Sequence, residues 1–336
     1  MKLNDYFKRF IGKISLNPTR EDRINSALQN WESIFINDDE ISSMFLDFYT
    51  QGSYSTSTAI KPKENDEYDV DVVLLLDADD EYDARELLTF VYDRMKTKEQ
   101  FKDKLKKKDR CIRVDYAGDF HVDIVPAKPT DDEHILISSK NENEWIETNP
   151  AGFTSWVKER HSDNNYKLVN LVKLTKFWRD NKVGADTAPK SILLTALLGD
   201  FIESKTSDAE TFVCSIEAIA DGLDEILVDG EPFYENPSLE GENLARDWNR
   251  EKYDIFIRKI TSLSEKARKA LEEEDKEKSI DLWIDVFGDK FPKELSEAIN
   301  FAERVSKNEV KVTQSGRLNE HHGVGVPKQR FYGYAE

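Results

Sequence analysis

The chain has 336 residues, of which 38% are hydrophobic and 11% aromatic, so it can build a sizeable apolar core and is not a globally disordered protein. Its 67 acidic residues outnumber 48 basic ones, which gives a formal net charge of −19. Because phosphate neutralisation dominates the affinity for long nucleic acids, this charge argues against a wide duplex-binding surface. A phosphate substrate would need metal ions and a few lysines for its neutralisation.

The sequence also indicates a compartment. No apolar run reaches the ~18 residues of a membrane span, and residues 1–17 lack the apolar stretch of a signal peptide. The two cysteines, Cys111 and Cys214, lie far apart in the sequence and suggest no disulfide framework. We therefore expect a cytoplasmic protein without a membrane partner.

The first half of the chain mixes helix and strand patterns. Apolar residues at helical spacing predict a helix over residues 21–36, and a second helix with a strongly basic end is expected over 82–108. Residues 69–77, DVDVVLLLD, predict a strand that is buried on both faces, because their apolar run is continuous. All predicted strands together cover residues 44–53, 69–77, 111–117, 120–127 and 134–139.

After Pro150 the pattern is helical throughout. Helical periods recur in YKLVNLVKLTKFWRDN and SILLTALLGDFIES, and around residues 209–220, 243–260 and 277–305. We therefore predict three parts. A mixed α/β domain covers residues 1–160 and includes an N-terminal helix, a helical domain covers 161–315, and an irregular tail covers 316–336.

Two aspartates begin the most hydrophobic predicted strand. Side chains at i and i+2 point to one face of a strand, so Asp69 and Asp71 project together. An Asp-x-Asp pair is by itself more often a solvated strand end, but burying an unpaired charge in so apolar a strand is costly. Paired carboxylates repel each other unless a cation lies between them, and their hard oxygens suit Mg²⁺. Asp123, in FHVDIVPA, is the best candidate for a third ligand of a two-metal site.

A small polar turn, GSYSTST, precedes this strand. Gly52 lets the backbone approach a ligand closely, and Ser53 offers a hydroxyl and an N–H to a phosphate oxygen. Such a turn alone is usually an ordinary loop. Beside the carboxylates, it predicts the phosphate clamp of a nucleotide site.

Gly52-Ser53, Asp69-Val70-Asp71-Val72 and Asp123 together resemble the signature of the polymerase-β-like nucleotidyltransferase superfamily. The stretch YSTSTAIKPKENDEY is similar to that of the CD-NTases, bacterial relatives of cyclic GMP–AMP synthase and oligoadenylate synthase that make cyclic oligonucleotide signals in anti-phage defence. The resemblance implies an α+β fold. In it, a polymerase-β-like nucleotidyltransferase core, a mixed sheet with helices, packs against a C-terminal helical domain of the oligoadenylate-synthase type.

The helical half carries the same resemblance. LVNLVKLTKFWRDN resembles the family's helix whose lysine reaches the triphosphate, and by position Lys176 is the better match, with Lys173 one turn earlier. PKSILLTALL resembles the next helix, whose early serine contacts phosphate, which implies that role for Ser191. The family often stacks a base on a tyrosine beside that serine, where this chain has Ile192.

The resemblance implies a template-independent nucleotidyltransferase that joins ATP, GTP, UTP or CTP into a cyclic di- or trinucleotide and releases pyrophosphate. Two Mg²⁺ ions, or Mn²⁺, would be held by Asp69, Asp71 and Asp123. Its expected partners are the NTP substrates, an effector reached through the product and a regulatory protein. We expect a monomer that binds no long nucleic acid.

Other functions remain open on the sequence alone. An enzyme acting on RNA, of the tRNA-end or poly(A) type, or one making linear oligoadenylate would use the same chemistry. An inactive nucleotide-binding scaffold would lack a metal carboxylate, and all three candidates are present. The basic segment 96–110, with eight Lys and Arg residues, is expected to be a solvated helix face rather than a docking or oligonucleotide-contacting surface.

Overall fold

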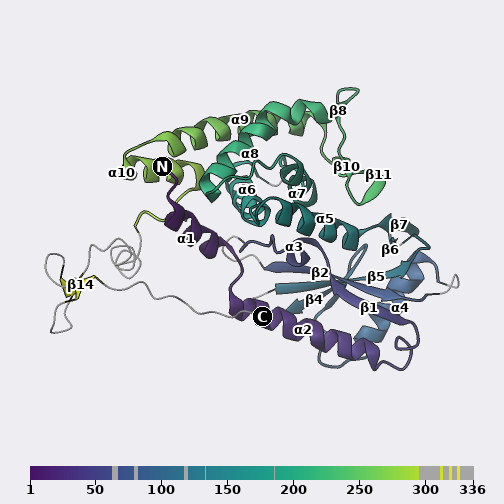
Figure 1. The fold of residues 1–336 in the computed structure, drawn as a ribbon. Helices are drawn as coiled ribbons and strands as arrows, with labels where there is room; N and C mark the ends of the chain where they lie inside the picture. Colours follow the sequence, from purple (N-terminus) through teal and green to yellow (C-terminus); the bar gives the residue numbers. More distant parts are fainter. Residues whose placement is uncertain are drawn as a thin grey trace.

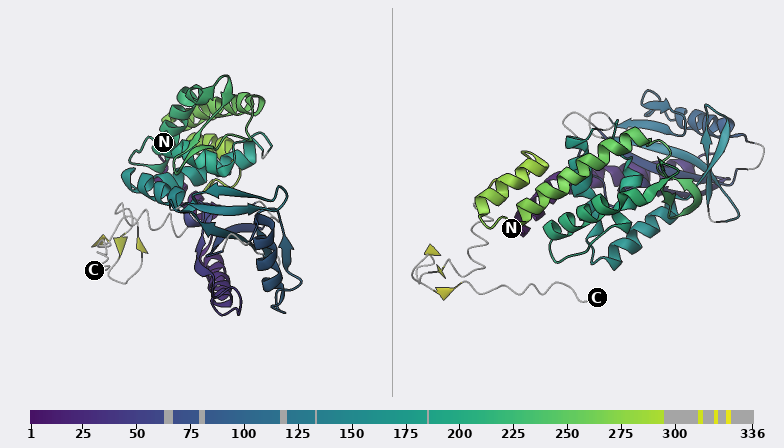
Figure 2. Two further views of the ribbon diagram at one scale, coloured as in Figure 1. Left: turned by 90° about the vertical axis from the view of Figure 1, so that its right-hand side faces the viewer. Right: turned by 90° about the horizontal axis from the view of Figure 1, so that it is seen from above.

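The computed structural model describes residues 1–62, 67–78, 82–116, 120–132, 134–184 and 186–294, together with three short strands at 311–312, 318–319 and 324–325. Figure 1 shows a half built around a twisted sheet and a half built of helices. The two further views in Figure 2 show the helical half stacked on the sheet half. This arrangement confirms the predicted α+β fold with a mixed sheet.

The large sheet has the strand order β1-β2-β5-β4-β3, and β6 and β7 extend it from β5. Strands β2 and β5 run parallel, whereas β1 pairs with β2 and β4 pairs with β5 in antiparallel fashion. The strands are β1 (Phe45–Thr50), β2 (Tyr68–Leu76), β3 (Leu105–Lys107), β4 (Ile112–Tyr116), β5 (Phe120–Pro129), β6 (Ile135–Ser139) and β7 (Glu144–Thr148). The predicted strands are therefore present, with small shifts at their ends.

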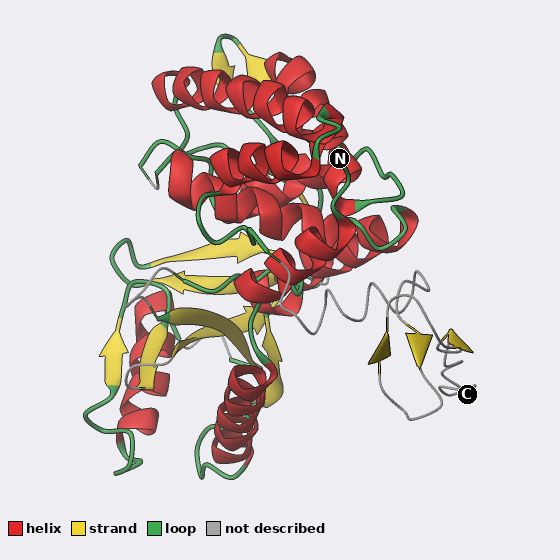
Figure 3. Ribbon diagram, turned by 90° about the vertical axis from the view of Figure 1, so that its left-hand side faces the viewer, coloured by secondary structure: helices red, strands yellow, loops and turns green. Residues whose placement is uncertain are grey.

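Helices α2 (Pro18–Ile36) and α4 (Ala84–Lys96) cover one face of this sheet. Trp31 of α2 and Val91 of α4 are buried in one core with Val72 of β2. In Figure 3 both helices lie on the side of the strands that faces away from the helical half. The other face of the sheet is thus left for polar side chains.

The predicted helix over 82–108 is wrong in its second part. A capping box between Asp83 and Glu86 starts α4, but the helix ends at Lys96 and the chain turns into β3. After the turn, Phe101 packs on Trp31, with ring centroids 4.4 Å apart, and β3 pairs with β4. Tertiary packing of these apolar residues overrides the helical propensity of the lysine-rich segment. The segment is consequently not one solvated helix face.

The helices of the second half share one apolar core. They are α5 (Pro150–Asp163), α6 (Leu168–Lys182), α7 (Ser191–Asp200), α8 (Asp208–Gly222), α9 (Arg250–Glu272) and α10 (Lys276–Phe287). Short elements connect α8 with α9, namely the 3-10 helix η1 (Leu223–Ile226) and strands β8 (Leu227–Val228), β9 (Glu231–Pro232), β10 (Glu235–Asn236) and β11 (Leu239–Asn243).

Helix α1 (Asn4–Ile14), near the start of the chain, also belongs to this helical core. Phe7 meets Trp283 of α10 edge-on, with ring centroids 4.8 Å apart, and Phe10 meets Phe177 of α6 in the same way at 5.1 Å. Helix α1 therefore packs with the later helices, and α2 is the N-terminal helix that packs on the sheet. The domain boundary near residue 160 stays a prediction.

Most of the predicted tail over 316–336, and residues 295–310 before it, lie outside the described residues. The described pieces are β12 (Lys311–Val312), β13 (Leu318–Asn319) and β14 (Val324–Gly325), which form a small antiparallel sheet. Within the parts of the chain that the structure describes, no helix combines the length and apolar character needed to cross a bilayer.

Candidate active site

Three adjacent strands place charged residues in one row across the sheet. Asp71 of β2 is the register partner of Asp123 of β5, and Asp123 is in turn the partner of Arg113 of β4. Side chains of register partners point to the same face, so the three lie side by side. Asp69, two residues before Asp71, shares that face. The predicted carboxylates are therefore brought together, and an arginine is brought to them.

The reason for this arrangement is a repeated sequence pattern. Each strand carries a valine between two polar or charged residues, in the triplets DVD (69–71), RVD (113–115) and HVD (121–123). The valines Val70, Val114 and Val122 are buried in the core under α2 and α4. Because side chains alternate along a strand, burying the valines places the flanking polar and charged side chains on the opposite face.

Arg113 forms the closest contacts among these charges. Its Nη2 donates to Asp69 Oδ1 at 2.6 Å and to Asp123 Oδ2 at 2.7 Å, and its Nε donates to Asp123 Oδ1 at 2.7 Å. Lys108 Nζ lies 3.6 Å from Asp123 Oδ2. Arg113 was not predicted as a site residue, although its triplet repeats the DVD pattern.

Among the residues that the structure describes, none provides Asp71 with such a cationic partner within hydrogen-bonding distance. Burial, and then the charges of Asp123 and Asp69, raise the pKa of Asp71 to about 6. A carboxyl group in this position is stabilised by a cation placed among the three carboxylates. In their present arrangement, however, the described His, Cys, Asp and Glu residues form no group of three or more around a point where a metal ion could bind.

The GS turn lies directly against this carboxylate face. It forms the short helix α3 (Gly52–Ser55), and the N–H of Gln51 donates to the carbonyl of Asp71 at 2.9 Å. Gly52 has a φ of +65°, and a Cβ at this position would lie 3.0 Å from Asp71 Oδ2. Both facts favour glycine here and place the turn directly against the carboxylate.

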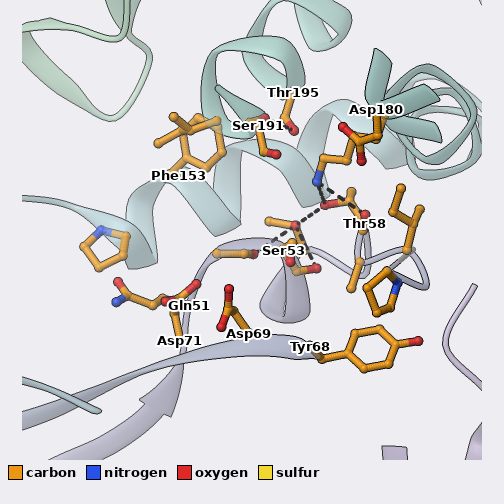
Figure 4. A pocket seen from close by; sticks show the side chains of 18 of the residues that line it. Gln51, Ser53, Thr58, Tyr68, Asp69, Asp71, Phe153, Asp180, Ser191 and Thr195 are labelled. Atoms are coloured by element: carbon orange, nitrogen blue, oxygen red, sulfur yellow. Dashed lines mark hydrogen bonds between the residues drawn. The ribbon is translucent and has the colours of Figure 1, made fainter. Parts of the chain in front are cut away.

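A cleft of about 510 Å³ opens between the carboxylate face, the GS turn and helices α5, α6 and α7. Figure 4 shows Asp69 and Asp71 on the sheet side, Ser53 in the turn, and Ser191 on the helical side. The predicted site residues that line it are Gly52, Ser53, Asp69, Asp71, Lys176 and Ser191. Asp123 does not line the cleft but lies beside Asp71 on the next strand and is 7% exposed.

Lys176 links the two halves of the molecule. From α6 its Nζ donates to the carbonyl and to Oγ1 of Thr58, at 3.3 Å and 3.0 Å, and Figure 4 draws these bonds as dashed lines. The side chain is 4% exposed, and burial, helped by the charge of Arg179, lowers the pKa of Lys176 to about 7. Lys173, the alternative candidate, lines a separate hollow with Glu21.

Ser191 begins α7 and receives a hydrogen bond from Arg179, an arginine that the sequence analysis did not single out. Arg179 Nη1 donates to Ser191 Oγ at 3.0 Å and to the carbonyl of Pro189 at 3.3 Å, and its Nε donates to Asp180 Oδ1 at 2.7 Å. Arg179 lines the cleft together with Lys176, three residues before it on α6. That spacing is the signal that would have found it.

The walls of the cleft also include apolar side chains. Tyr68 and Phe153 line it and are largely buried, whereas Ile192 lines it with 40% of its surface exposed. Among the described residues of the cleft wall, Ile192 therefore combines an apolar side chain with ready access from solvent.

The sequence of this chain is similar to those of known nucleotide synthases. Residues 1–161 match the family model of the Second Messenger Oligonucleotide or Dinucleotide Synthetase (SMODS) domain. The chain is 29% identical over 295 residues to a c-di-GMP synthase of Roseivirga ehrenbergii, covering 78% of each chain. It is 28% identical over 272 residues to a cyclic AMP-AMP-AMP synthase of an Acinetobacter species, covering 76% of each.

A solved structure shares the fold. CdnC of Escherichia coli MS115-1, determined in complex with HORMA-deltaN, superposes with a TM-score of 0.71 at 19% sequence identity. The match covers 86% of this chain and 98% of that one. The sheet half and the helical half are therefore both found in that protein.

Proposed function

Because this chain is a member of the CD-NTase family, we propose that it joins nucleoside triphosphates into a cyclic di- or trinucleotide second messenger in anti-phage signalling, with release of pyrophosphate. It is a nucleotidyltransferase, and its catalysis depends on divalent metal ions. The observation that carries the proposal is the cleft that joins the Asp69 and Asp71 carboxylates, the GS turn and Lys176.

The residues present fit a divalent metal site in their chemistry. Asp69, Asp71 and Asp123 are hard oxygen donors on one sheet face, and the raised pKa of Asp71 reflects a half-buried carboxyl that a cation would stabilise. We assign these three residues as ligands of two Mg²⁺ ions, with Mn²⁺ as an alternative. When bound, such ions lower the pKa of the acceptor ribose hydroxyl and neutralise charge on the transferring phosphoryl group.

The opposite end of the cleft suits the triphosphate. Ser53 in the turn and Ser191 on α7 both line it, and the Lys176 side chain reaches from α6 to Thr58, just after the turn. We assign all three to the pyrophosphate end of the donor nucleotide, with Arg179 holding Ser191 in place. In this role Lys176 would exchange its bonds to Thr58 for bonds to phosphate oxygens, because a charge-assisted bond to an anion is stronger.

Ile192 supplies an apolar surface for a nucleobase at the position where the family often has a tyrosine. Its side chain is 40% exposed in the cleft, so a base can reach it. Burial of that surface contributes through the hydrophobic effect, without the aromatic stacking that a tyrosine ring adds.

Two alternatives are less well supported. An RNA-acting or linear oligoadenylate enzyme would share the carboxylates, but the c-di-GMP synthase and the cyclic AMP-AMP-AMP synthase to which this chain is similar both make cyclic nucleotides. The net charge of −19 also disfavours a long polyanionic acceptor.

We further propose that the chain acts in the cytoplasm as a monomer and that a protein partner regulates it, as CdnC was solved with HORMA-deltaN.

The direct test of the proposed function is to identify the reaction product. Purified protein is incubated with ATP, GTP, UTP and CTP and either Mg²⁺ or Mn²⁺, without nucleic acid, and the products are treated with phosphatase and measured by mass spectrometry. We expect a phosphatase-resistant cyclic product and stoichiometric pyrophosphate. Synthesis that requires added RNA, or a linear product whose mass falls on phosphatase treatment by the loss of its 5′-phosphates, would overturn the proposal.

Gly52 offers a test of the turn. Replacing Gly52 by alanine should lower product formation by about tenfold to a hundredfold, because the added Cβ lies 3.0 Å from Asp71 Oδ2 and displaces that carboxylate. Gly184→Ala is the matched control, since Gly184 also has a positive φ, of +95°, but has nothing within 4 Å of the added Cβ. Initial rates of pyrophosphate release and melting temperatures of both variants separate a site effect from backbone strain.

A further inference from the structure

The guanidinium of Arg113 lies where a cation shared by two carboxylates would have to lie. Nη2 is 2.6 Å from Asp69 Oδ1 and 2.7 Å from Asp123 Oδ2, so one nitrogen bridges the two acids. With Nε on the other oxygen, Asp123 is held by a bidentate pair. Such fork contacts between arginine and carboxylate are among the strongest hydrogen bonds in proteins.

This contact differs from an ordinary structural ion pair elsewhere in the chain. Arg94 also bridges two acids, Asp38 at 3.0 Å and Glu40 at 2.6 Å. There, the Asp38 side chain is 1% exposed and accepts hydrogen bonds from two backbone N–H groups, so the pair holds a loop. The Asp69 side chain, by contrast, is 56% exposed, so it needs no ion pair to offset a cost of burying its charge.

Any withdrawal of Arg113 from the carboxylates must come from its side chain. Its backbone is fixed, because β4 is paired with β3 on one side and with β5 on the other. Its side chain, however, is 17% exposed on the polar face of the sheet. Because a guanidinium does not lose its proton in proteins, the charge can leave the space between Asp69 and Asp123 only by movement of the side chain.

We propose that Arg113 is a built-in counter-cation of the carboxylate site, which a divalent ion must displace from Asp69 before the site can hold metal. The inference rests on the proposed function, since it takes the carboxylates as metal ligands. The contact between Nε and Asp123 can persist when Nη2 is displaced, so Arg113 then acts as a positioning residue for that carboxylate. Arg113 thereby weakens metal binding to the nucleotide-free chain.

The test is metal binding without nucleotide. Mn²⁺ is titrated into the nucleotide-free wild-type chain and into Arg113→Gln, and free Mn²⁺ is measured by electron paramagnetic resonance. Arg113→Gln removes the guanidinium that competes with the ion for the carboxylates, so this variant should bind Mn²⁺ about tenfold to a hundredfold more tightly. Arg113→Lys, which keeps the charge but not the fork, should give an intermediate affinity. Arg94→Gln, which breaks the structural pair, should leave Mn²⁺ affinity unchanged.

Equal or weaker Mn²⁺ binding by folded Arg113→Gln would overturn the inference, because Arg113 would then support the ligands rather than replace the metal. Absence of Mn²⁺ binding by wild type and variant alike would overturn the proposed metal site itself. A readout that needs no variant is a crystal of the wild-type chain soaked with Mn²⁺. Anomalous density at the carboxylates with Arg113 still bridging Asp69 and Asp123 would also refute displacement.

Discussion

Replacing Asp69 and Asp71 together by asparagine is expected to lower product formation by at least about a thousandfold and to leave the chain folded. The amide is uncharged and a poor ligand for a hard divalent ion, so the loss falls on charge stabilisation during phosphoryl transfer. Folding should survive, because the core side of β2 is formed by Val70, Val72 and Leu74, which the change leaves in place.

Pyrophosphate release and mass spectrometry of the product measure the first effect, and thermal melting measures the second. Asp77→Asn is the matched control, because Asp77 is an exposed aspartate just beyond the other end of β2. We expect normal synthesis from this variant. Residual synthesis by the Asp69, Asp71 double variant near the wild-type rate would refute the assignment of the carboxylates.

Replacing Lys176 by methionine should have opposite effects on stability and on nucleotide affinity. Burial lowers the pKa of Lys176 to about 7 in the folded chain, whereas an unfolded lysine titrates near its ordinary value of about 10.4. Below pH 7 the folded chain carries a buried charge that destabilises it. Methionine has a similar length and no charge, so the free energy of unfolding should rise by on the order of a few kcal/mol at pH 7 and below.

The pH dependence gives the sign of this effect. Between pH 7 and about 10 the unfolded chain binds the lysine proton and the folded chain does not, so Lys176 makes stability rise with pH in that window. The rise should be absent from Lys176→Met. Thermal melting from pH 6 to pH 9.5, compared between wild type and variant, measures it; identical profiles would contradict the expected burial of the charge.

Nucleotide binding should respond in the other direction. Losing the charged partner of the triphosphate should weaken NTP binding by about tenfold to a hundredfold. Lys173→Met is the control for this effect, because Lys173 lines a separate hollow. Isothermal titration with a non-hydrolysable NTP compares the two variants. A larger loss from Lys173→Met would reassign the triphosphate lysine.

The sequence predicts the elements whose burial can be read locally. The continuous apolar runs of β2 and β5 identify two central strands, and the apolar spacing of α2 identifies a helix. The helix predicted over 82–108 is too long, and the cause is non-local. The chain turns after α4 so that Phe101 packs on Trp31, a residue far away in the sequence. Helix α1 was missed, although Tyr6, Phe7 and Phe10 have helical spacing.

The site was predictable in its carboxylates and less so in its cations. Asp69, Asp71 and Asp123 follow from strand alternation and from the family signature, whereas their partner Arg113 depends on the register between β4 and β5. No local pattern fixes that register. The roles of the site residues remain predictions, because their geometry constrains these roles without testing them.

The placement of α1 bears on how the chain folds during its synthesis. Helix α1 precedes α6, α8 and α10 in the chain and is synthesised before them, yet its apolar face packs against these three helices. The sheet with α2 and α4 has a separate apolar core, so its formation does not depend on the packing partners of α1. Phe7 and Phe10 therefore lack their aromatic partners Trp283 and Phe287 until α10 has been synthesised.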